Sequence, residues 1–159
     1  MVYHSLMRMS SHCVHFIYAD HLDDEDIWPA AEWKRKGVRL AYVDYRHLNA
    51  DDRQRMPDII GRELRLENVP YGEEARSTKR ISPWIPFMDD LITLSRNAGG
   101  LIMVIDHAEE MLAERSRTMF ELIEAFLIQS HHWFERQKPC HLCFQMEESR
   151  LVKRSFDLV

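Results

Sequence analysis

An uninterrupted run of large aliphatic residues, LIMVI at 101–105, constrains the fold of this chain more than any other feature. No polar residue alternates with the apolar ones, so a strand formed by this run would be buried on both faces. The pair Gly99–Gly100 precedes the run and Asp106 follows it. Strands of this kind lie in the middle of a parallel sheet covered by helices on both sides. The run therefore predicts an α/β domain with this strand at its centre.

Three further segments have the composition of strands, and the stretches between them have the spacing of helices. The strand segments are CVHFIYA at 13–19, VRLAYVD at 38–44 and CHLCFQM at 140–146. The helical segments are 27–36, a segment capped by Asn49, a segment that begins at Ser82–Pro83, and about 116–136. Strands that alternate with helices pair in parallel through right-handed crossovers. The predicted fold class is α/β, a small layered fold with a mostly parallel sheet of three to four strands flanked by helices.

The helix after Asn49 contains a proline, which leaves its beginning open. Met56, Ile60 and Leu64 recur at helical spacing and predict one apolar face. Pro57 lies inside the segment, and proline disrupts a helix anywhere beyond its first turn. We therefore expect the helix either to begin near Met56 or to kink there.

Length and composition favour one domain over residues 1–159. Apolar residues make up 45% of the chain, but no apolar run reaches the roughly 20 residues of a membrane span. Three cysteines are too few, and odd in number, for a disulfide framework, so we expect a cytoplasmic protein. The net charge of −5 argues against nucleic-acid binding and suits a basic protein partner, although solubility alone also explains it.

Motifs of known enzymes are absent from the sequence, so we predict no catalytic residues and no cofactor. The sequence has no G-x-x-x-x-G-K-[ST] loop, no G-x-S-x-G and no H-E-x-x-H. The segment LIMVIDHAEE nevertheless resembles the magnesium-binding strand of P-loop ATPases, with Asp106 at the strand exit. Without the lysine-bearing loop the phosphates have no cradle. This resemblance is the basis of an alternative interpretation, a degenerate AAA- or P-loop-like module that has lost its nucleotide.

The pair Cys140 and Cys143 has the C-x-x-C spacing of some zinc and redox sites. The pair falls on a predicted strand, and side chains three apart on a strand point to opposite faces. Only one such pair is present, whereas a structural zinc ion takes four ligands. We therefore expect two buried core cysteines and no metal site.

An acidic and aromatic group in the middle of the chain is the strongest candidate for a binding surface. Its members are Tyr71, Glu73, Trp84, Asp89 and Asp90. Aromatic side chains dominate binding hot spots, and carboxylates pair with arginine. An ordinary solvated helix face is the other explanation of this group.

The register of the helix that follows Ser82 decides which way those carboxylates point. We expect its apolar stripe to run through Ile85 and Met88, then Leu91 or Ile92, and then Leu94 or Ser95. In that register Asp89 and Asp90 point away from the core.

Residues 38–147 resemble barstar-type proteins, the intracellular inhibitors of secreted ribonucleases. The resemblance lies in the order of VRLAYVDYRHL, the loop VPYGEE, the helix IPFMDDLITL, the strand GLIMVIDHAEEML and a last strand opened by Cys140. It implies a barstar-like core at 38–147, an N-terminal extension at 1–37 with one strand and a short helix, and a C-terminal tail at 148–159. It further implies that Tyr71 and Asp90, with Asp89 beside it, contact the ribonuclease. The acid on the family's long helix corresponds to Glu135, although Phe134 aligns equally well with that position. The family's asparagine-leucine-aspartate-alanine-leucine run is missing from this chain.

We therefore predict a non-enzymatic protein-binding inhibitor of the immunity or antitoxin type. It would block a basic nuclease toxin through Tyr71, Glu73, Trp84, Asp89, Asp90 and Glu135. The alternative is the degenerate AAA- or P-loop-like module, which would act as an interaction or sensor domain. A third interpretation is an enzyme whose site is assembled from residues that lie far apart in the sequence.

Overall fold

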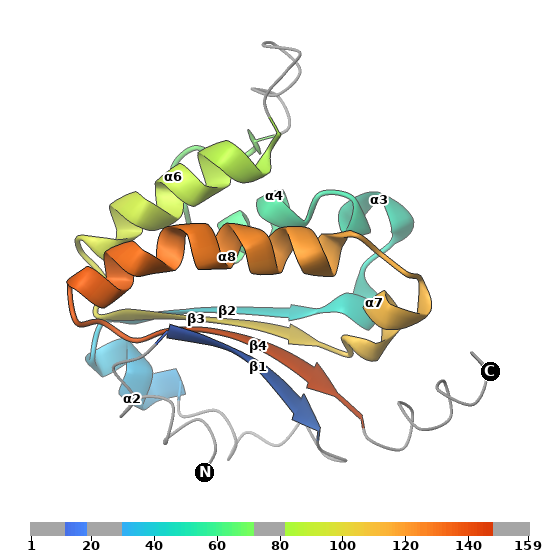
Figure 1. Ribbon diagram of the computed structural model, residues 1–159, viewed down its shortest axis with the longest axis horizontal. Helices are drawn as coiled ribbons and strands as arrows, with labels where there is room; N and C mark the ends of the chain where they lie inside the picture. Colours follow the sequence, from blue (N-terminus) through green and yellow to red (C-terminus); the bar gives the residue numbers. More distant parts are fainter. Residues whose placement is uncertain (1–11, 19–29, 72–81, 148–159) are drawn as a thin grey trace.

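Four parallel strands form one sheet in the order β1-β4-β3-β2 (Figure 1). A computed structural model of the chain describes residues 12–18, 30–71 and 82–147. The strands are β1 (His12–Tyr18), β2 (Val38–Asp44), β3 (Gly100–Asp106) and β4 (Cys140–Met146). The helices are α2 (Ala30–Arg35), η2 (Tyr45–His47), α3 (Ala50–Arg53), α4 (Met56–Glu63), α6 (Trp84–Ser95), α7 (Glu109–Ala113) and α8 (Thr118–Glu135).

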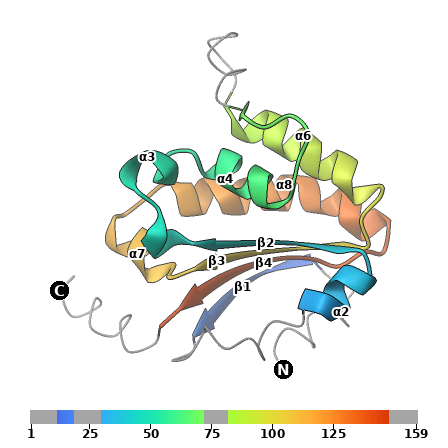
Figure 2. The same ribbon diagram turned by 180° about the vertical axis from the view of Figure 1, so that it is seen from behind.

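Helices cover both faces of the sheet, as the two opposite views show (Figures 1 and 2). The long helix α8 lies across one face, with α4 and α6 on the same side, and α2 lies on the other face. The α/β class and the flanked parallel sheet are therefore confirmed. Within the described ranges, no helix combines the length and apolarity needed to cross a bilayer.

The central strand β3 is buried along its whole length, as its uninterrupted apolar run predicts. Leu101, Met103 and Ile105 belong to the core beneath α4, α6 and α8. Ile102 and Val104 belong to the smaller core beneath α2, which is centred on Trp33. Because successive side chains of a strand point to opposite faces, one apolar run supplies both cores.

The strand and helix predictions hold to within about three residues at each boundary. The segment after Asn49 resolves into two helices, α3 and α4, and Pro57 lies in the first turn of α4. In the first turn a proline interrupts no helical hydrogen bond, so this chain uses the first of the two expected arrangements. The Asn49 side chain caps α3 by accepting a hydrogen bond of 2.8 Å from the backbone N–H of Asp52.

The chain makes its closest backbone approach where β2 and β3 begin. Gly37 has φ of +74°, the left-handed conformation that ends α2 and turns the chain into β2. The Gly99 N–H donates to the Gly37 carbonyl over 2.7 Å, just before β3. A Cβ on Gly99 would lie 2.2 Å from the carbonyl oxygen of Lys36. Only glycine therefore fits at position 99, because there is no space for a Cβ.

The apolar register predicted for α6 is wrong by one residue. The buried side chains are Trp84, Phe87 and Leu91, whereas Ile85 is exposed. The rings of Trp84 and Phe87 pack edge to face, with their centroids 5.6 Å apart. The aromatic pair has more apolar surface to bury than Ile85 and Met88. This explains why the helix is turned so that the side with Trp84 and Phe87 faces the core.

Candidate protein-binding site

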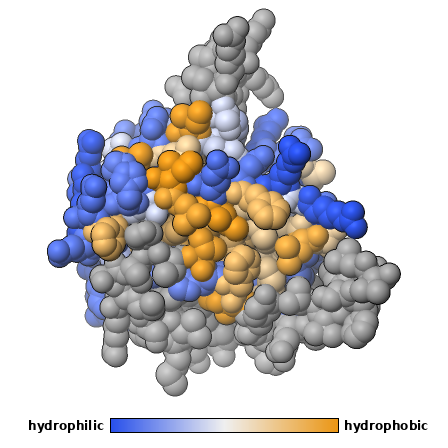
Figure 3. All heavy atoms as spheres, viewed as in Figure 1, coloured by the Kyte–Doolittle hydropathy of each residue, from blue (hydrophilic) through white to orange (hydrophobic). Residues whose placement is uncertain are grey.

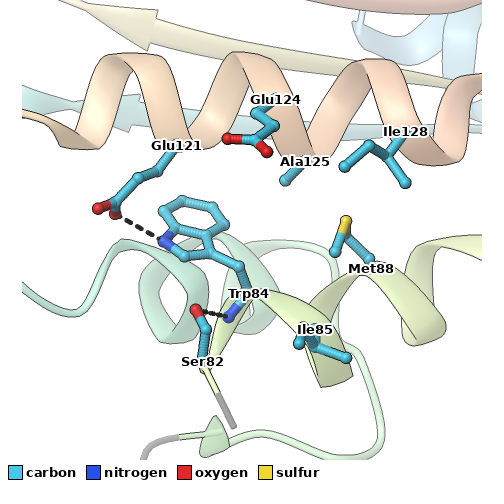
Figure 4. Close-up of a pocket in the computed structure, with 8 residues that line it drawn as sticks. All are labelled: Ser82, Trp84, Ile85, Met88, Glu121, Glu124, Ala125 and Ile128. Carbon is cyan, nitrogen blue, oxygen red and sulfur yellow. Dashed lines mark hydrogen bonds between the residues drawn. The ribbon is translucent and has the colours of Figure 1, made fainter.

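A groove of about 370 Å³ runs between the first half of α6 and the middle of α8 (Figure 4). The lining includes Trp84, Ile85 and Met88 of α6, and Ser82, two residues before the helix. From α8 the lining residues are Glu121, Glu124, Ala125 and Ile128. The two helices also pack against each other below the groove. Residues almost forty positions apart in the sequence thus form one concave surface.

Trp84 closes one end of this groove and is held in place by polar contacts (Figure 4). Its indole N–H donates to the Glu121 carboxylate over 2.8 Å, and its backbone N–H donates to the Ser82 hydroxyl over 3.3 Å. A hydrogen bond to a charged acceptor stabilises more than one to a neutral acceptor. The ring is therefore fixed in one orientation, and fixed rings lose little entropy when a partner packs against them.

The groove is apolar at one end and acidic at the other. Met88 and Ile128 lie together at the apolar end, while Glu121 lies beside the indole of Trp84 and Glu124 lies between them (Figure 4). Glu121 and Glu124 are the only charged side chains among the lining residues. An occupant of this groove would therefore bury an apolar group and present a positive charge about one helical turn away.

Helix α8 also carries large apolar side chains on its outer face. Phe120 is 72% exposed, Leu127 is 54% exposed and Ile128 is 52% exposed. Phe120, Leu127 and Phe134 are seven residues apart, a spacing that returns to nearly the same side of a helix after two turns. We call these three residues the α8 stripe. Hydrophobic residues gather across the middle of the face that carries α8 (Figure 3).

The sequence did not identify the residues of this surface other than Trp84. Ile85 and Met88 were assigned to the core because they recur at helical spacing. The sequence does contain one indication of this surface. Helix α8 has more large apolar residues than a single buried face can hold. The large apolar residues of the buried face are Met119, Leu122, Phe126 and Trp133, and Ala125, Gln129 and Ser130 are buried beside them. The apolar residues left over mark the second, exposed face.

Tyr71 and Asp90, which the sequence placed on a binding surface, are buried against each other. Asp90 is 8% exposed, so its predicted outward orientation is wrong. Its carboxylate accepts hydrogen bonds from the Tyr71 hydroxyl over 2.6 Å and from the Asn68 amide over 2.6 Å. The Tyr71 backbone N–H is bound in turn by the Asp58 carboxylate over 2.8 Å. Donors from a neighbouring loop thus satisfy Asp90 inside the protein.

The other predicted binding residues are spread over different places. Asp89 is exposed on α6, next to Met88 of the groove, and Glu135 is exposed at the end of α8. Trp84 is mostly buried but lines the groove. Glu73 lies outside the described residues. The structure therefore brings Trp84 into one groove with Glu121 and Glu124, leaves Asp89 exposed on α6 outside the lining residues, and buries Tyr71 and Asp90 elsewhere.

A second polar cluster lies at the carboxyl ends of β2 and β3. Asp106 is fully buried there, and its carboxylate accepts hydrogen bonds from the Tyr42 hydroxyl and from the backbone N–H of His107. The His107 ring is 2.8 Å from an Asp44 oxygen through Nδ1 and 3.3 Å from a Glu147 oxygen through Nε2. Polar atoms from β2, from β3 and from the residues that follow β3 and β4 are thus bound to one another at this edge of the sheet.

The same cluster predicts a pH-dependent stability. Burial lowers the pKa of His107, but the charge of Asp106 and the hydrogen bond and charge of Asp44 outweigh it, so the pKa lies above 6.5. A raised pKa in the folded state means that protonated His107 contributes stability below pH 6.5, and this contribution is lost as the pH rises through the raised value. We expect the melting temperature of the protein to fall over that interval.

Calorimetric melting curves across that pH range test this expectation, with His107→Asn as the control. His107 has φ of +54°, and asparagine is one of the residues that tolerate this conformation. The variant therefore keeps the turn and removes the titrating group. The decrease above pH 6.5 should disappear in the variant; an unchanged slope would show that another group causes it.

The two cysteines of the C-x-x-C pair lie on opposite faces of β4. Cys140 belongs to the core beneath α8, and Cys143 belongs to the core beneath α2. Burial raises the pKa of both thiols, that of Cys143 to about 12, so neither is a thiolate near neutral pH. The prediction of two buried core cysteines is confirmed.

Comparisons with known proteins reveal a likeness of fold. No protein-family model and no curated protein matches the chain. Among solved structures, the chain is similar to the ORC2 protein of Aeropyrum pernix, solved as ADPNP–ADP complexes, with a TM-score of 0.58 and 13% sequence identity. The similarity covers 99% of this chain and 41% of the ORC2 chain, so this chain spans about two fifths of that protein's length. At this identity the likeness shows the fold alone.

Proposed function

We propose that this chain is a non-enzymatic protein-binding module that binds a basic partner protein through the surface formed by α6 and α8. The observation that carries the proposal is the combination of the groove with the α8 stripe. Phe120 and Leu127 are large apolar side chains that are more than half exposed on α8, the helix whose Glu121 binds the ring of Trp84. Exposed apolar patches rimmed by polar residues are typical of protein interaction sites.

The scaffold of this module resembles a nucleotide-binding one, and we propose that it works without a nucleotide. The ORC2 structures that share the fold contain ADPNP and ADP. In the present chain Asp106, the acid at the exit of the central strand, is buried. One of its carboxylate oxygens accepts a hydrogen bond from the Tyr42 hydroxyl, and the other accepts one from the backbone N–H of His107. The sequence also has no phosphate-binding loop with the lysine that such a site requires. Both observations support the interpretation as a degenerate AAA- or P-loop-like module.

A thermal-shift experiment tests the part of the proposal that concerns nucleotides. A ligand that binds only the native state at a hundred times its dissociation constant stabilises by about 2.7 kcal/mol, which is several degrees of melting temperature. We expect ATP or ADP with Mg²⁺, each at millimolar concentration, to leave the melting temperature unchanged. A reproducible increase with either nucleotide would contradict this part of the proposal, and Asp106→Asn would then show whether the strand exit is involved.

Site-directed photo-cross-linking tests the binding surface itself. With p-benzoylphenylalanine in place of Leu127, we expect a specific cross-linked partner in the cells that produce the protein. The matched control carries the same group in place of Lys34, which is exposed on α2 on the opposite face of the sheet.

The captured protein is then purified, and its affinity for the original chain is measured by calorimetry. Leu127→Asp should weaken the binding by about tenfold or more, because it places a charge in the apolar stripe. Since Leu127 is more than half exposed, the variant should melt at nearly the temperature of the original protein. Equal labelling from positions 127 and 34, or an unaffected affinity, would refute the proposed surface.

The immunity-type inhibitor is a narrower form of the same proposal. It is supported by the two glutamates of the groove and by the exposed Asp89 beside it, which suit the cationic active site of a nuclease. Under this form the protein is cytoplasmic and inhibits a basic nuclease toxin encoded beside it. The test is a nuclease assay with that toxin, in which Asp89→Ala should weaken inhibition; full inhibition by a variant carrying Asp89→Ala and Glu124→Ala would exclude this form.

A further inference from the structure

We propose that the surface of α6 and α8 receives an amphipathic helix of the partner, with lysine or arginine facing Glu121 and Glu124 and an apolar seam facing the α8 stripe. This inference rests on the proposed function and adds the chemistry and the shape of the partner segment.

The shape follows from the spacing of the exposed apolar residues. Phe120 and Leu127 are seven residues apart on one side of α8, and Ile128, about 100° further around the helix, lines the groove. A seven-residue apolar repeat matches the contacts of a second helix that crosses at a small angle. An extended peptide presents alternate side chains every two residues and would not follow this spacing. The geometry therefore favours a helix lying along α8.

The charge of the partner follows from what flanks the stripe. The exposed acidic residues of α8 are Glu121, Glu124 and Glu135, and one exposed arginine flanks each end of the helix, Arg117 and Arg136. Glu124 and Ile128 are four residues apart, so a basic side chain and an apolar anchor about one turn apart on the partner would meet both. The aliphatic stem of an arginine or a lysine can also pack on the fixed ring of Trp84 while its charge reaches Glu121.

A second copy of this chain is the competing occupant, and charge disfavours it. Pairing two α8 helices would bring the carboxylates of both copies to the same interface, and like charges that face each other weaken association. A basic helix removes that repulsion and gains Coulomb attraction instead. The observations therefore favour a different protein as the partner.

The experiment uses the full chain and a displayed library of helical peptides. Each peptide has apolar residues at heptad spacing, and its flanking positions are randomised among lysine, glutamate and glutamine. We expect the selected peptides to carry lysine rather than glutamate at the positions next to the apolar seam. The best peptide and a twin with those lysines replaced by glutamate are then synthesised, and we expect the twin to bind about tenfold more weakly or worse.

Variants of the protein test whether the peptide binds at this surface. They also distinguish a loss of charge from a loss of folded structure. The double variant Glu121→Gln with Glu124→Gln keeps an acceptor for the Trp84 indole. Its affinity for the peptide should be about three- to tenfold lower than that of the original protein. Glu63→Gln, an exposed glutamate on α4, is the matched control and should leave the affinity unchanged. Leu127→Asp should abolish binding, and its melting temperature shows that the fold is intact.

Four results would overturn the inference. The selection enriches no peptide, or it enriches acidic peptides. The glutamate twin binds with the same affinity as the lysine peptide, or Leu127→Asp leaves the affinity for the peptide unchanged. Concentration-dependent dimerisation in sedimentation that Leu127→Asp removes would identify a second copy as the occupant, which also overturns it. If cross-linking at position 127 still captures a partner in any of these cases, the proposed function stands and only the basic helix is wrong.

Discussion

Replacing Asp90 with alanine should lower the free energy of unfolding by about 2–3 kcal/mol, whereas the same change at Asp89 should alter it by less than about 0.5 kcal/mol. The two residues are adjacent in the sequence but opposite in environment. Asp90 accepts a hydrogen bond from the Tyr71 hydroxyl inside the protein, and Asp89 is exposed. Asp90→Ala removes the charged acceptor of the Tyr71 hydroxyl and of the Asn68 amide, and a buried hydrogen bond to a charged group contributes about 1.5–3 kcal/mol.

Urea denaturation followed by tryptophan fluorescence measures both variants, and a double-mutant cycle tests the mechanism. Tyr71→Phe removes the donor, so adding Asp90→Ala to it should cost less than Asp90→Ala costs alone. Strict additivity would mean that the hydroxyl and the carboxylate are not coupled. A stable Asp90→Ala variant that had lost partner binding would instead restore the role that the sequence suggested for this residue.

Gly99→Ala should be the more damaging of two glycine substitutions at the beginning of the sheet, with a loss of about 3 kcal/mol or more. The new Cβ would lie 2.2 Å from the carbonyl oxygen of Lys36, and backbone atoms cannot move aside as the end of a side chain can. Relief requires β2 and β3 to separate where they begin. The hydrogen bond from Gly99 to Gly37 would be lost in the process.

Gly37→Ala is the matched comparison, because that position has space but an unfavourable backbone conformation. Its nearest neighbour to a new Cβ is the Gly99 nitrogen at 3.5 Å, an ordinary contact, and the cost comes from the φ of +74°. We expect a loss of about 1–2 kcal/mol. Equal midpoints for the two variants in urea would show that the close approach relaxes without a penalty.

The fold was predictable from local patterns, whereas the binding surface was not. The apolar run of β3 and the breaks at Gly37 and Pro57 each depend on a few neighbouring residues, and each agrees with the structure. The register of α6 depends on which of two overlapping stripes meets the core. Both stripes include Leu91, and the one with Trp84 is buried. The sequence alone contains no information on the shape of the opposing surface.

That single rotation explains why Asp90 was misplaced. One residue corresponds to about 100° around a helix, enough to exchange an outward side chain for an inward one. The groove was missed for a different reason: it requires α6 to lie beside the middle of α8, and that packing joins segments that are distant in the chain. Residues such as Glu121 and Ile128 acquire their significance only once the two helices are adjacent.

The strand order has a consequence for the synthesis of the protein. β1 is the first described strand to leave the ribosome, and its neighbour in the sheet, β4, is the last. A nascent chain that ends before residue 140 therefore has no place to dock β1. The helices and the pair β2–β3 can assemble as they emerge, but the sheet becomes complete only when translation has passed Met146. Contacts of such long separation slow folding, so the pairing of β1 with β4 is expected to be a late step of folding.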